Sequence, residues 1–299
     1  MSRLKELEEK AIARLKLFEP KEPVDPYYLA YSGGKDSDTI LILAELAGVR
    51  FEAVHNLTTA DAPETVYYVR SKPNVRIDRP DTTMWELIPQ KLMPPTRIAR
   101  YCCSELKERG GQGRVVVTGV RKAESKAREE RTGSVQIIGK PQTTKKLAEE
   151  IGAEYRQSKQ GGIILNNDNT EDRELVEHCY MQSKVMVNPI YDWEDADVWE
   201  FLKYYGCKSN PLYECGFKRV GCIGCPMTNV KERWREFANY QKFKVNYIRA
   251  FDRMIQKRKE RGLSTDWQNG KDVFRFWMEE DYKQITFDDL AAGTEFENF

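Results

Sequence analysis

Long apolar runs are missing from the 299-residue sequence, and so is a strong excess of charge of either sign. The apolar runs fall far short of the ~20 residues that a membrane-spanning helix needs. No charged segment followed by an apolar one opens the chain, so we expect no secretory signal. The net charge of +1 says little about partners, so a nucleic-acid surface would have to be local. We therefore expect a cytoplasmic protein without a membrane partner.

No internal repeat is evident, and the length suits one large domain or one domain with an appendage. Apolar segments predict strands at residues 27–30, 51–55, 75–77 and 115–118. The segments between and before them predict helices at residues 3–17, 39–48 and 83–92. Strands that alternate with helices favour a doubly wound, mostly parallel sheet, which binds ligands at the carboxyl ends of its strands. We expect residues 130–185 to form an insertion or a lid over that site.

The Walker A spacing is absent, but another glycine-rich turn follows the first predicted strand. Gly33 and Gly34 let the backbone curl, and the N–H groups and dipole of the following helix favour a phosphate. Ser32 and Ser37 offer hydroxyl donors, and Lys35 offers a charge. The turn therefore predicts an anion site. The alternative is an ordinary glycine-rich connection between a strand and a helix.

The run Ser-Gly-Gly-Lys-Asp-Ser at residues 32–37 resembles the pyrophosphate-binding PP-loop of the adenine-nucleotide hydrolase-like superfamily. That superfamily includes N-type ATP pyrophosphatases and the phosphoadenylylsulfate (PAPS) reductase family. Residues 119–128 are similar to the G-x-R-x-x-E-S-x-x-R element of that family, and residues 193–226 to its W-x-x-x-D-V-W, N-x-L-Y and Gly-Cys-x-x-Cys-Pro motifs. The resemblance implies an α/β PP-loop domain with a cluster-binding segment at residues 1–227. Residues 228–299 would form a helical region outside it.

The resemblance also implies roles for individual residues. Lys35, Asp36 and Arg121 would be catalytic: Lys35 neutralises phosphate charge, and Asp36 either binds Mg²⁺ or caps the turn. Arg121 and Arg128 suit bidentate contacts with phosphate or sulfate, the alternative being a solvated helix face. The predicted nucleotide-binding residues are Ser32, Gly33, Gly34, Lys35, Asp36, Ser37, His55, Glu64, Gly119, Arg121, Glu124, Ser125 and Arg128.

Seven cysteines form an odd set that includes a tandem pair and a C-x-x-C turn. In a cytosolic enzyme this pattern indicates a metal or cluster rather than disulfides. Cys102 and Cys103, together with Cys222 and Cys225, are similar to the cluster motif of adenylylsulfate reductases. The resemblance implies that these four thiolates hold one [4Fe–4S] cluster.

Three alternatives to this ligand set stay open. Cys215 could replace one member of the tandem pair, because it lies near the C-x-x-C turn in sequence. Zinc accepts four thiolates with similar spacing. The cysteines could also be buried and inert, which is the reading we prefer for Cys179 and Cys207.

The function divides into two classes of enzyme and one class of binding protein. Adenylylsulfate and PAPS reductases attack sulfur with a cysteine near the C-terminus. No cysteine follows Cys225 here, so we expect no plain reductase unless Cys215 takes that role. PP-loop sulfurtransferases, such as the phosphorothioation protein DndC and the tRNA thiolation enzymes, convert ATP to AMP and pyrophosphate with Mg²⁺. We expect this second class, with a sulfide or electron donor protein as partner. A non-enzymatic nucleotide-binding cluster sensor is the third alternative.

Residues 228–262 carry eleven Lys and Arg against four Asp and Glu, interleaved with aromatic residues. Basic residues with aromatic residues suit a nucleic-acid substrate. Trp234, Phe237, Ile248, Phe251 and Ile255 nevertheless keep helical spacing, so we expect the aromatic residues to pack in a core and the basic ones to face water. A nucleic-acid substrate and a homodimer are left open.

Overall fold

The structure is a computed structural model that describes residues 2–108, 110–139, 141–158, 161–180 and 183–279. The chain forms two compact units that interleave along the sequence. Unit 1 comprises residues 1–56, 63–79 and 108–220, and unit 2 comprises residues 57–62, 80–107 and 221–299. The linear division expected after residue 227 stays a prediction. Each unit is described by itself.

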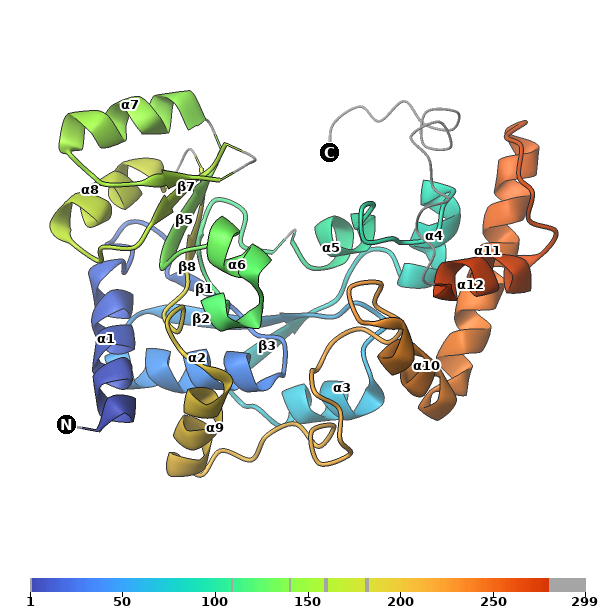
Figure 1. Cartoon of the computed structure of the whole chain (residues 1–299), viewed down its shortest axis with the longest axis horizontal. Coiled ribbons are helices and arrows are strands. Elements are labelled where there is room, and N and C mark those ends of the chain that lie inside the picture. Colours follow the sequence, from blue (N-terminus) through green and yellow to red (C-terminus); the bar gives the residue numbers. More distant parts are fainter. Residues whose placement is uncertain (1, 109, 140, 159–160, 181–182, 280–299) are drawn as a thin grey trace. The chain divides into compact units, whose positions relative to one another are not determined.

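Unit 1 is built on an eight-stranded sheet with the order β3-β2-β1-β4-β8-β5-β7-β6 (Figure 1). The first five of these strands are parallel, and the last three pair in antiparallel fashion. The α/β fold with a mostly parallel sheet is thereby confirmed. The strands are β1 Tyr27–Ala30, β2 Phe51–Asn56, β3 Val75–Asp78, β4 Val115–Val117, β5 Val135–Ile138, β6 Arg156–Gln157, β7 Ile163–Leu165 and β8 Lys184–Val187.

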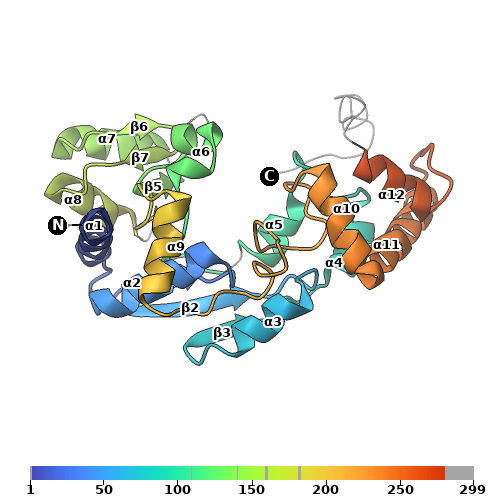
Figure 2. The ribbon, with the colours of Figure 1, turned by 60° about the horizontal axis from the view of Figure 1, so that its bottom comes forward.

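Helices cover the central strands, which explains their apolar composition. All three valines of β4 are buried, as are Tyr27, Tyr28 and Leu29 of β1. Three helices, α1, α2 and α9, pack on one another on the same side of the sheet (Figures 1 and 2). The described helices of unit 1 are α1 Arg3–Leu17, α2 Lys35–Ala47, α3 Pro63–Arg70, the 3₁₀ turn η1 Lys122–Glu124, α6 Lys126–Arg131, α7 Pro141–Ile151, α8 Thr170–Cys179 and α9 Asp195–Tyr204.

Residues 130–185 were expected to form an insertion or a lid, but the described strands of this segment belong to the main sheet. The apolar segments of β5 and β7 extend the main sheet instead, with Val135 opposite both Val187 of β8 and Leu165 of β7. Both strands are only three or four residues long, and polar segments separate them. Their membership in the sheet depends on partners distant in sequence, which local pattern alone does not reveal.

The buried carboxyl of Asp172 in α8 predicts a pH dependence of stability. Burial raises its pKa to about 6, outweighing a hydrogen bond from the Asn167 backbone N–H. Between pH ~4 and ~6 the folded state keeps a proton that the unfolded state has lost, so stability falls as pH rises through this window. We expect D172N to remove up to about 3 kcal/mol of this fall. Urea unfolding at several pH values measures it, with exposed Glu171→Gln as control; parallel curves for wild type and D172N would contradict the assignment.

Unit 2 has a helical core rich in aromatic side chains. Its described helices are α4 Met84–Lys91, α5 Tyr101–Leu106, α10 Val230–Asn239, α11 Gln241–Glu260 and α12 Gly270–Met278 (Figure 2). Phe237, Tyr247, Phe251 and Trp277 are almost fully buried, and their ring centroids lie 4.7–6.0 Å apart. The expectation that these aromatic residues pack in a core is therefore confirmed.

Trp234 differs from the other aromatic residues with helical spacing, because it is 46% exposed. The exposed basic side chains of this region are those of Lys231, Lys242, Arg249, Arg253, Lys257, Lys259 and Arg261. Within the described residues, no helix is long and apolar enough to cross a membrane.

Candidate nucleotide and cluster sites

The glycine-rich turn joins β1 to α2 and is held closed by its own groups. Gly33 has φ +77°, in the left-handed region, and Gly34 is the N-cap of α2. The Ser37 hydroxyl donates to the Gly34 carbonyl (2.7 Å) and accepts from the Gly34 N–H (3.1 Å). Ser32 is exposed, with its Oγ 3.3 Å from that of Ser37. Ser37 thus shapes the turn, whereas Ser32 faces solvent.

Two cations meet two carboxylates beside this turn. Lys35 Nζ lies 3.3 Å from Asp36 Oδ2 and 3.1 Å from Asp195 Oδ1. Arg121 reaches the same carboxylates, with Nε 2.7 Å from Asp36 Oδ1 and Nη2 2.9 Å from Asp195 Oδ1. The side chains of Lys35 and Arg121 are 9% and 4% exposed. The structure therefore brings together the three residues predicted to be catalytic.

The opposite charges in this group favour one another's ionised forms. Partial burial tends to raise the pKa of Asp195, but hydrogen bonds and charges from Lys35 and Arg121 outweigh it, so its pKa is lowered. Burial likewise opposes the charge of Arg121, yet Asp36 and Asp195 raise its pKa. Arg121 and Asp195 therefore both stay charged at neutral pH.

Arg121 reaches the turn because Gly119 lets two chain segments approach closely. A Cβ on Gly119 would lie 2.9 Å from the Cβ and 3.1 Å from the backbone carbonyl of Asp36. Glu124 accepts a hydrogen bond from the Arg121 N–H (3.0 Å) and so fixes the start of η1. The position of the Arg121 guanidinium therefore depends on both Gly119 and Glu124.

The remaining predicted nucleotide residues lie elsewhere in unit 1. Arg128 is about half exposed, with Nε 3.8 Å from Glu124, and Ser125 caps α6 by accepting from the Arg128 N–H. Buried His55 contacts the Tyr31 carbonyl through Nδ1 (3.0 Å). Glu64 lies in the first turn of α3. Their binding roles stay predictions, and the structure assigns Ser125 and His55 contacts within the protein.

Several residues that support the turn were not assigned a role from the sequence. The Tyr213 hydroxyl accepts from the Lys35 N–H (3.0 Å), and Asn210 donates to the Gly33 carbonyl (3.0 Å). Both belong to the Asn-x-Leu-Tyr run, which was the available signal. Asp195 lies two residues after Trp193, within the family's W-x-x-x-D-V-W segment, and its contacts depend on tertiary structure. The Gly34 and Lys35 N–H groups therefore both have acceptors within the protein.

The backbone of Gly33 predicts a measurable stability difference. A Cβ there would lie 2.9 Å from Val69 and 3.2 Å from Thr65, in addition to the strain of a positive φ. We expect G33A to lower the free energy of unfolding by about 2–4 kcal/mol. Gly48 is the matched control: it has φ +67° with nothing within 4 Å, so G48A should cost only about 1 kcal/mol. Urea unfolding compares them, and equal losses would contradict the tight packing of α3 against the turn.

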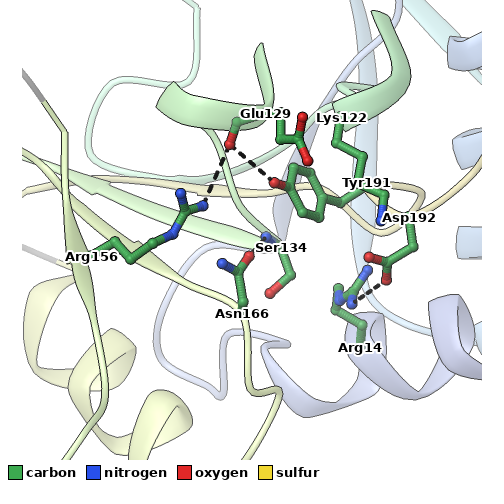
Figure 3. Close-up of a pocket in the computed structure, with 8 residues that line it drawn as sticks. All are labelled: Arg14, Lys122, Glu129, Ser134, Arg156, Asn166, Tyr191 and Asp192. Carbon is green, nitrogen blue, oxygen red and sulfur yellow. Dashed lines mark hydrogen bonds and ion pairs between the residues drawn. The ribbon is translucent and has the colours of Figure 1, made fainter. Parts of the chain in front are cut away.

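A pocket of about 290 Å³ lies at the same edge of the sheet, where β8 and β7 end and β5 begins (Figure 3). Lys122 and Tyr191 line it, and they neighbour the segments that carry Arg121 and Asp195. In Figure 3 the side chains of Arg156 and Tyr191 both point to the Glu129 backbone oxygen. The other lining residues are Arg14, Ser134, Asn166 and Asp192.

The four cysteines of the predicted cluster site all belong to unit 2. Cys102 and Cys103 lie in α5, and Cys222 and Cys225 flank a turn in which the Cys225 N–H donates to the Cys222 carbonyl (3.2 Å). A hydrogen bond with Cys103, burial and the charges of the other three thiols raise the pKa of Cys102. The four sulfurs are therefore near enough to influence one another's ionisation.

The C-x-x-C turn is rigidly packed. Gly224 has φ +74°, and a Cβ there would lie 2.5 Å from the Phe237 ring. Its N–H donates to buried Glu236 (2.7 Å), and Tyr247 donates to the Ile223 carbonyl (2.9 Å). Cys222 pairs with Asp61 in a short β-bridge and is buried. The aromatic core of unit 2 thus holds two of the four sulfurs in place.

A cation near these thiols was not anticipated from the sequence. The charge of Cys222 raises the pKa of Lys107, and Asp61 and Cys103 add to this effect. Lys107 follows the tandem cysteines by four residues, so its position next to the C-x-x-C turn depends on tertiary structure.

The other cysteines lie in unit 1. Cys215 is exposed there, while Cys179 is buried in the sheet core and Cys207 packs against it. None of the seven cysteines, which all lie in the part of the chain that the structure describes, forms a disulfide. Among the described residues, no three His, Cys, Asp or Glu side chains are arranged to hold a single metal ion. The choice of ligands therefore stays a prediction.

A family model for the phosphoadenosine phosphosulfate reductase domain matches residues 26–228, which is more than half of the chain. The chain belongs to this family. The match covers the PP-loop turn, the segment with Arg121, and all seven cysteines. The predicted family is confirmed, and it takes its name from an enzyme.

The relatives of this chain differ in sequence identity and in the length of the matching segment. An uncharacterised protein of Methanocaldococcus jannaschii is 25% identical over 256 residues, covering 79% of this chain and 52% of that protein. Adenosine 5'-phosphosulfate reductase of Burkholderia cepacia is 45% identical over 38 residues, or 13% of this chain and 15% of that enzyme. The chain thus spans about half or less of the length of these curated relatives.

Among solved structures, U34-tRNA thiolase NcsA from Methanococcus maripaludis with its [4Fe-4S] cluster aligns over 89% of this chain and 82% of that chain. The identity is 11% and the TM-score is 0.41, values too low to support an argument about function.

Proposed function

We propose that this member of the family is a PP-loop enzyme that binds an adenine nucleotide and a [4Fe–4S] cluster. Its reaction would be ATP-dependent sulfur transfer that forms AMP and pyrophosphate. The observation that carries the proposal is the convergence of buried Lys35 and Arg121 beside the turn before α2. Two buried cations next to a helix N-terminus suit a polyphosphate.

In the proposed reaction, the residues of the site have separate parts. Lys35 and the start of α2 would hold the β- and γ-phosphates, which leave as pyrophosphate when an acceptor oxygen attacks the α-phosphorus. Arg121 would bind the α-phosphate through its guanidinium. Sulfide would then displace AMP from the adenylated acceptor, replacing oxygen by sulfur.

Mg²⁺ fits the acidic side of this site. Mg²⁺ in nucleotide enzymes is usually bound by one or two carboxylates together with substrate phosphates. The carboxylate of Asp36 lies directly beside Lys35 and is partly exposed, so it is the residue that would hold the ion. When bound, Mg²⁺ would neutralise phosphate charge as the leaving group departs.

A [4Fe–4S] cluster fits the donor set of unit 2. Cys102, Cys103, Cys222 and Cys225 would be its ligands, and the cluster would carry sulfide or an electron when bound. A zinc ion, the alternative, draws four sulfurs to ~2.3 Å from one point, whereas a four-iron cluster distributes them over four corners. Iron with acid-labile sulfide in the purified protein would identify the cluster, and zinc without sulfide would identify the single ion.

The test of the proposal is a calorimetric nucleotide panel on anaerobically purified protein. The ligands are ATP with Mg²⁺, adenylylsulfate, PAPS and AMP. We expect selective binding of ATP, with AMP and pyrophosphate as products once an acceptor is supplied. Binding of none of the four would contradict the nucleotide site.

Sulfonucleotide reduction is the second candidate, supported by the 45% identity to the Burkholderia cepacia reductase over 38 residues. A sulfonucleotide carries phosphate oxygens of the kind that Lys35 and Arg121 would bind. Selective binding of adenylylsulfate or PAPS in the panel would favour this reaction. Exposed Cys215 would then be the thiol to replace, since a nucleophile must reach its substrate.

The partners follow from the proposed reaction. A donor protein would pass sulfide or electrons to the bound cluster. The exposed lysines and arginines of residues 231–261 would offer a surface for a nucleic-acid acceptor. A homodimer stays a proposal for sedimentation analysis. If nucleotide binds without turnover on any acceptor, a cluster sensor becomes the better description.

A further inference from the structure

The Asp195 side chain differs from its partners in exposure. It is the first residue of α9, and its side chain is 62% exposed, whereas those of Lys35 and Arg121 are nearly buried. One oxygen, Oδ1, lies 3.1 Å from Lys35 Nζ and 2.9 Å from Arg121 Nη2. A single carboxylate oxygen thus bridges two buried cations from the solvent side.

The charge balance explains why a carboxylate is present at this position. Lys35 and Arg121 bring two positive charges into a poorly solvated site, and Asp36 neutralises only one of them. An anion that binds between these cations would have to displace Asp195 or lie beside a second negative charge. Carboxylate and phosphate oxygens make the same charge-assisted contacts with ammonium and guanidinium groups.

We propose that Asp195 occupies the position of a nucleotide phosphate oxygen in the ligand-free protein and leaves it when the nucleotide binds. The inference rests on the proposed function, because it requires that Lys35 and Arg121 bind phosphate. Asp195 is then a residue that weakens nucleotide affinity and keeps the two cations in position. It is neither a substrate ligand nor a metal ligand.

The surroundings allow Asp195 to move without disturbing the rest of the site. Arg121 keeps its contact with Asp36 (2.7 Å), and Lys35 keeps its own with the same carboxylate (3.3 Å). The start of α9 is held independently, because the Glu194 N–H donates to Asp197 (2.7 Å) and Asp197 pairs with Arg3. Rotation of the Asp195 side chain toward solvent breaks none of these contacts.

The test is D195N, titrated calorimetrically with inorganic pyrophosphate and with ATP, each with and without Mg²⁺. Removing the competing charge should tighten binding of both ligands by about three- to tenfold. The control is E200Q, which removes an exposed carboxylate from the middle of the same helix and should leave affinity unchanged. If D195N does not fold, D195S removes the same charge and serves instead.

Three results would overturn the inference or its basis. Equal or weaker binding by D195N, while the wild type binds, overturns the inference and leaves the nucleotide site standing. Weaker binding seen only with Mg²⁺ overturns it as well, because Asp195 would then be a metal ligand. Binding of neither ligand by either protein overturns the proposed function, and the inference with it.

A double-mutant cycle adds an internal check. In a K35A background, Asp195 has lost one of the two cations it bridges. D195N should then improve pyrophosphate affinity by less than it does in the wild type, because the competition is weaker. An undiminished effect would show that Asp195 acts through another group, contrary to the inference.

Discussion

Replacing Lys35 with alanine is expected to weaken binding of ATP by about 100-fold, since a hydrogen bond to a charged group is worth about 1.5–3 kcal/mol. The Lys35 side chain is 9% exposed, and its ammonium lies 3.1–3.3 Å from two carboxylates. Its removal leaves Arg121 as the remaining cation of the group to contact the phosphates. The measurement is calorimetric titration of the purified variant with ATP and Mg²⁺.

The matched control for this prediction is K203A. Lys203 lies in the last turn of α9, is exposed and belongs to the same unit, so its loss changes the net charge equally. We expect K203A to bind ATP within about twofold of the wild type. Wild-type affinity in K35A would contradict the PP-loop site, and equal losses in both variants would indicate a general charge effect.

Replacing Cys222 with serine is expected to abolish the iron–sulfur chromophore of anaerobically purified protein. Cys222 is buried against Asp61 and Thr58, at a turn packed on the aromatic core. A hydroxyl is a poor cluster ligand compared with a thiolate, so cluster content should fall to about a tenth or less. Iron and acid-labile sulfide analysis, together with the visible absorbance, measures the loss.

C215S separates the two candidate ligand sets. Cys215 is exposed, and the electrostatic interactions of Cys102 are with Cys103, Cys222 and Cys225, so we expect replacement of Cys215 to leave iron and sulfide unchanged. Bleaching by C215S with retention of colour in C102S or C103S would instead support Cys215 as the fourth ligand. Zinc without acid-labile sulfide in the wild type would contradict the cluster.

The nucleotide site shows how far local patterns could be followed. Ser32–Ser37 identified the turn because a strand, two glycines and a helix start are contiguous in sequence. The meeting of Lys35 with Arg121 was expected from a shared sheet edge, and the distances of both to Asp36 agree with that expectation. Asp195 was not anticipated, because nothing near it in sequence indicates that the first turn of α9 faces the PP-loop turn.

The cysteines and the antiparallel edge of the sheet show which contacts sequence patterns could not predict. The grouping of Cys102 with Cys222 followed from the resemblance to the cluster motif of adenylylsulfate reductases, and both residues lie in unit 2. The strands at residues 135–138 and 163–165 were visible as apolar runs, but their partners could not be predicted. β5 pairs with β8, and β7 pairs with β5, in antiparallel contacts between segments that are distant in sequence.

The sequence by itself therefore determined the family, the type of fold and the residues with suitable chemistry, because these depend on contiguous motifs and on hydrophobic periodicity. Tertiary structure decided which charged and polar groups lie in contact with one another. It placed the Asp195 carboxylate between two buried cations, directed Ser37 and Tyr213 toward the backbone of the turn, and brought Lys107 close to Cys222. Long-range packing sets such contacts, and each depends on the position of a whole helix or loop rather than on the residues next to it.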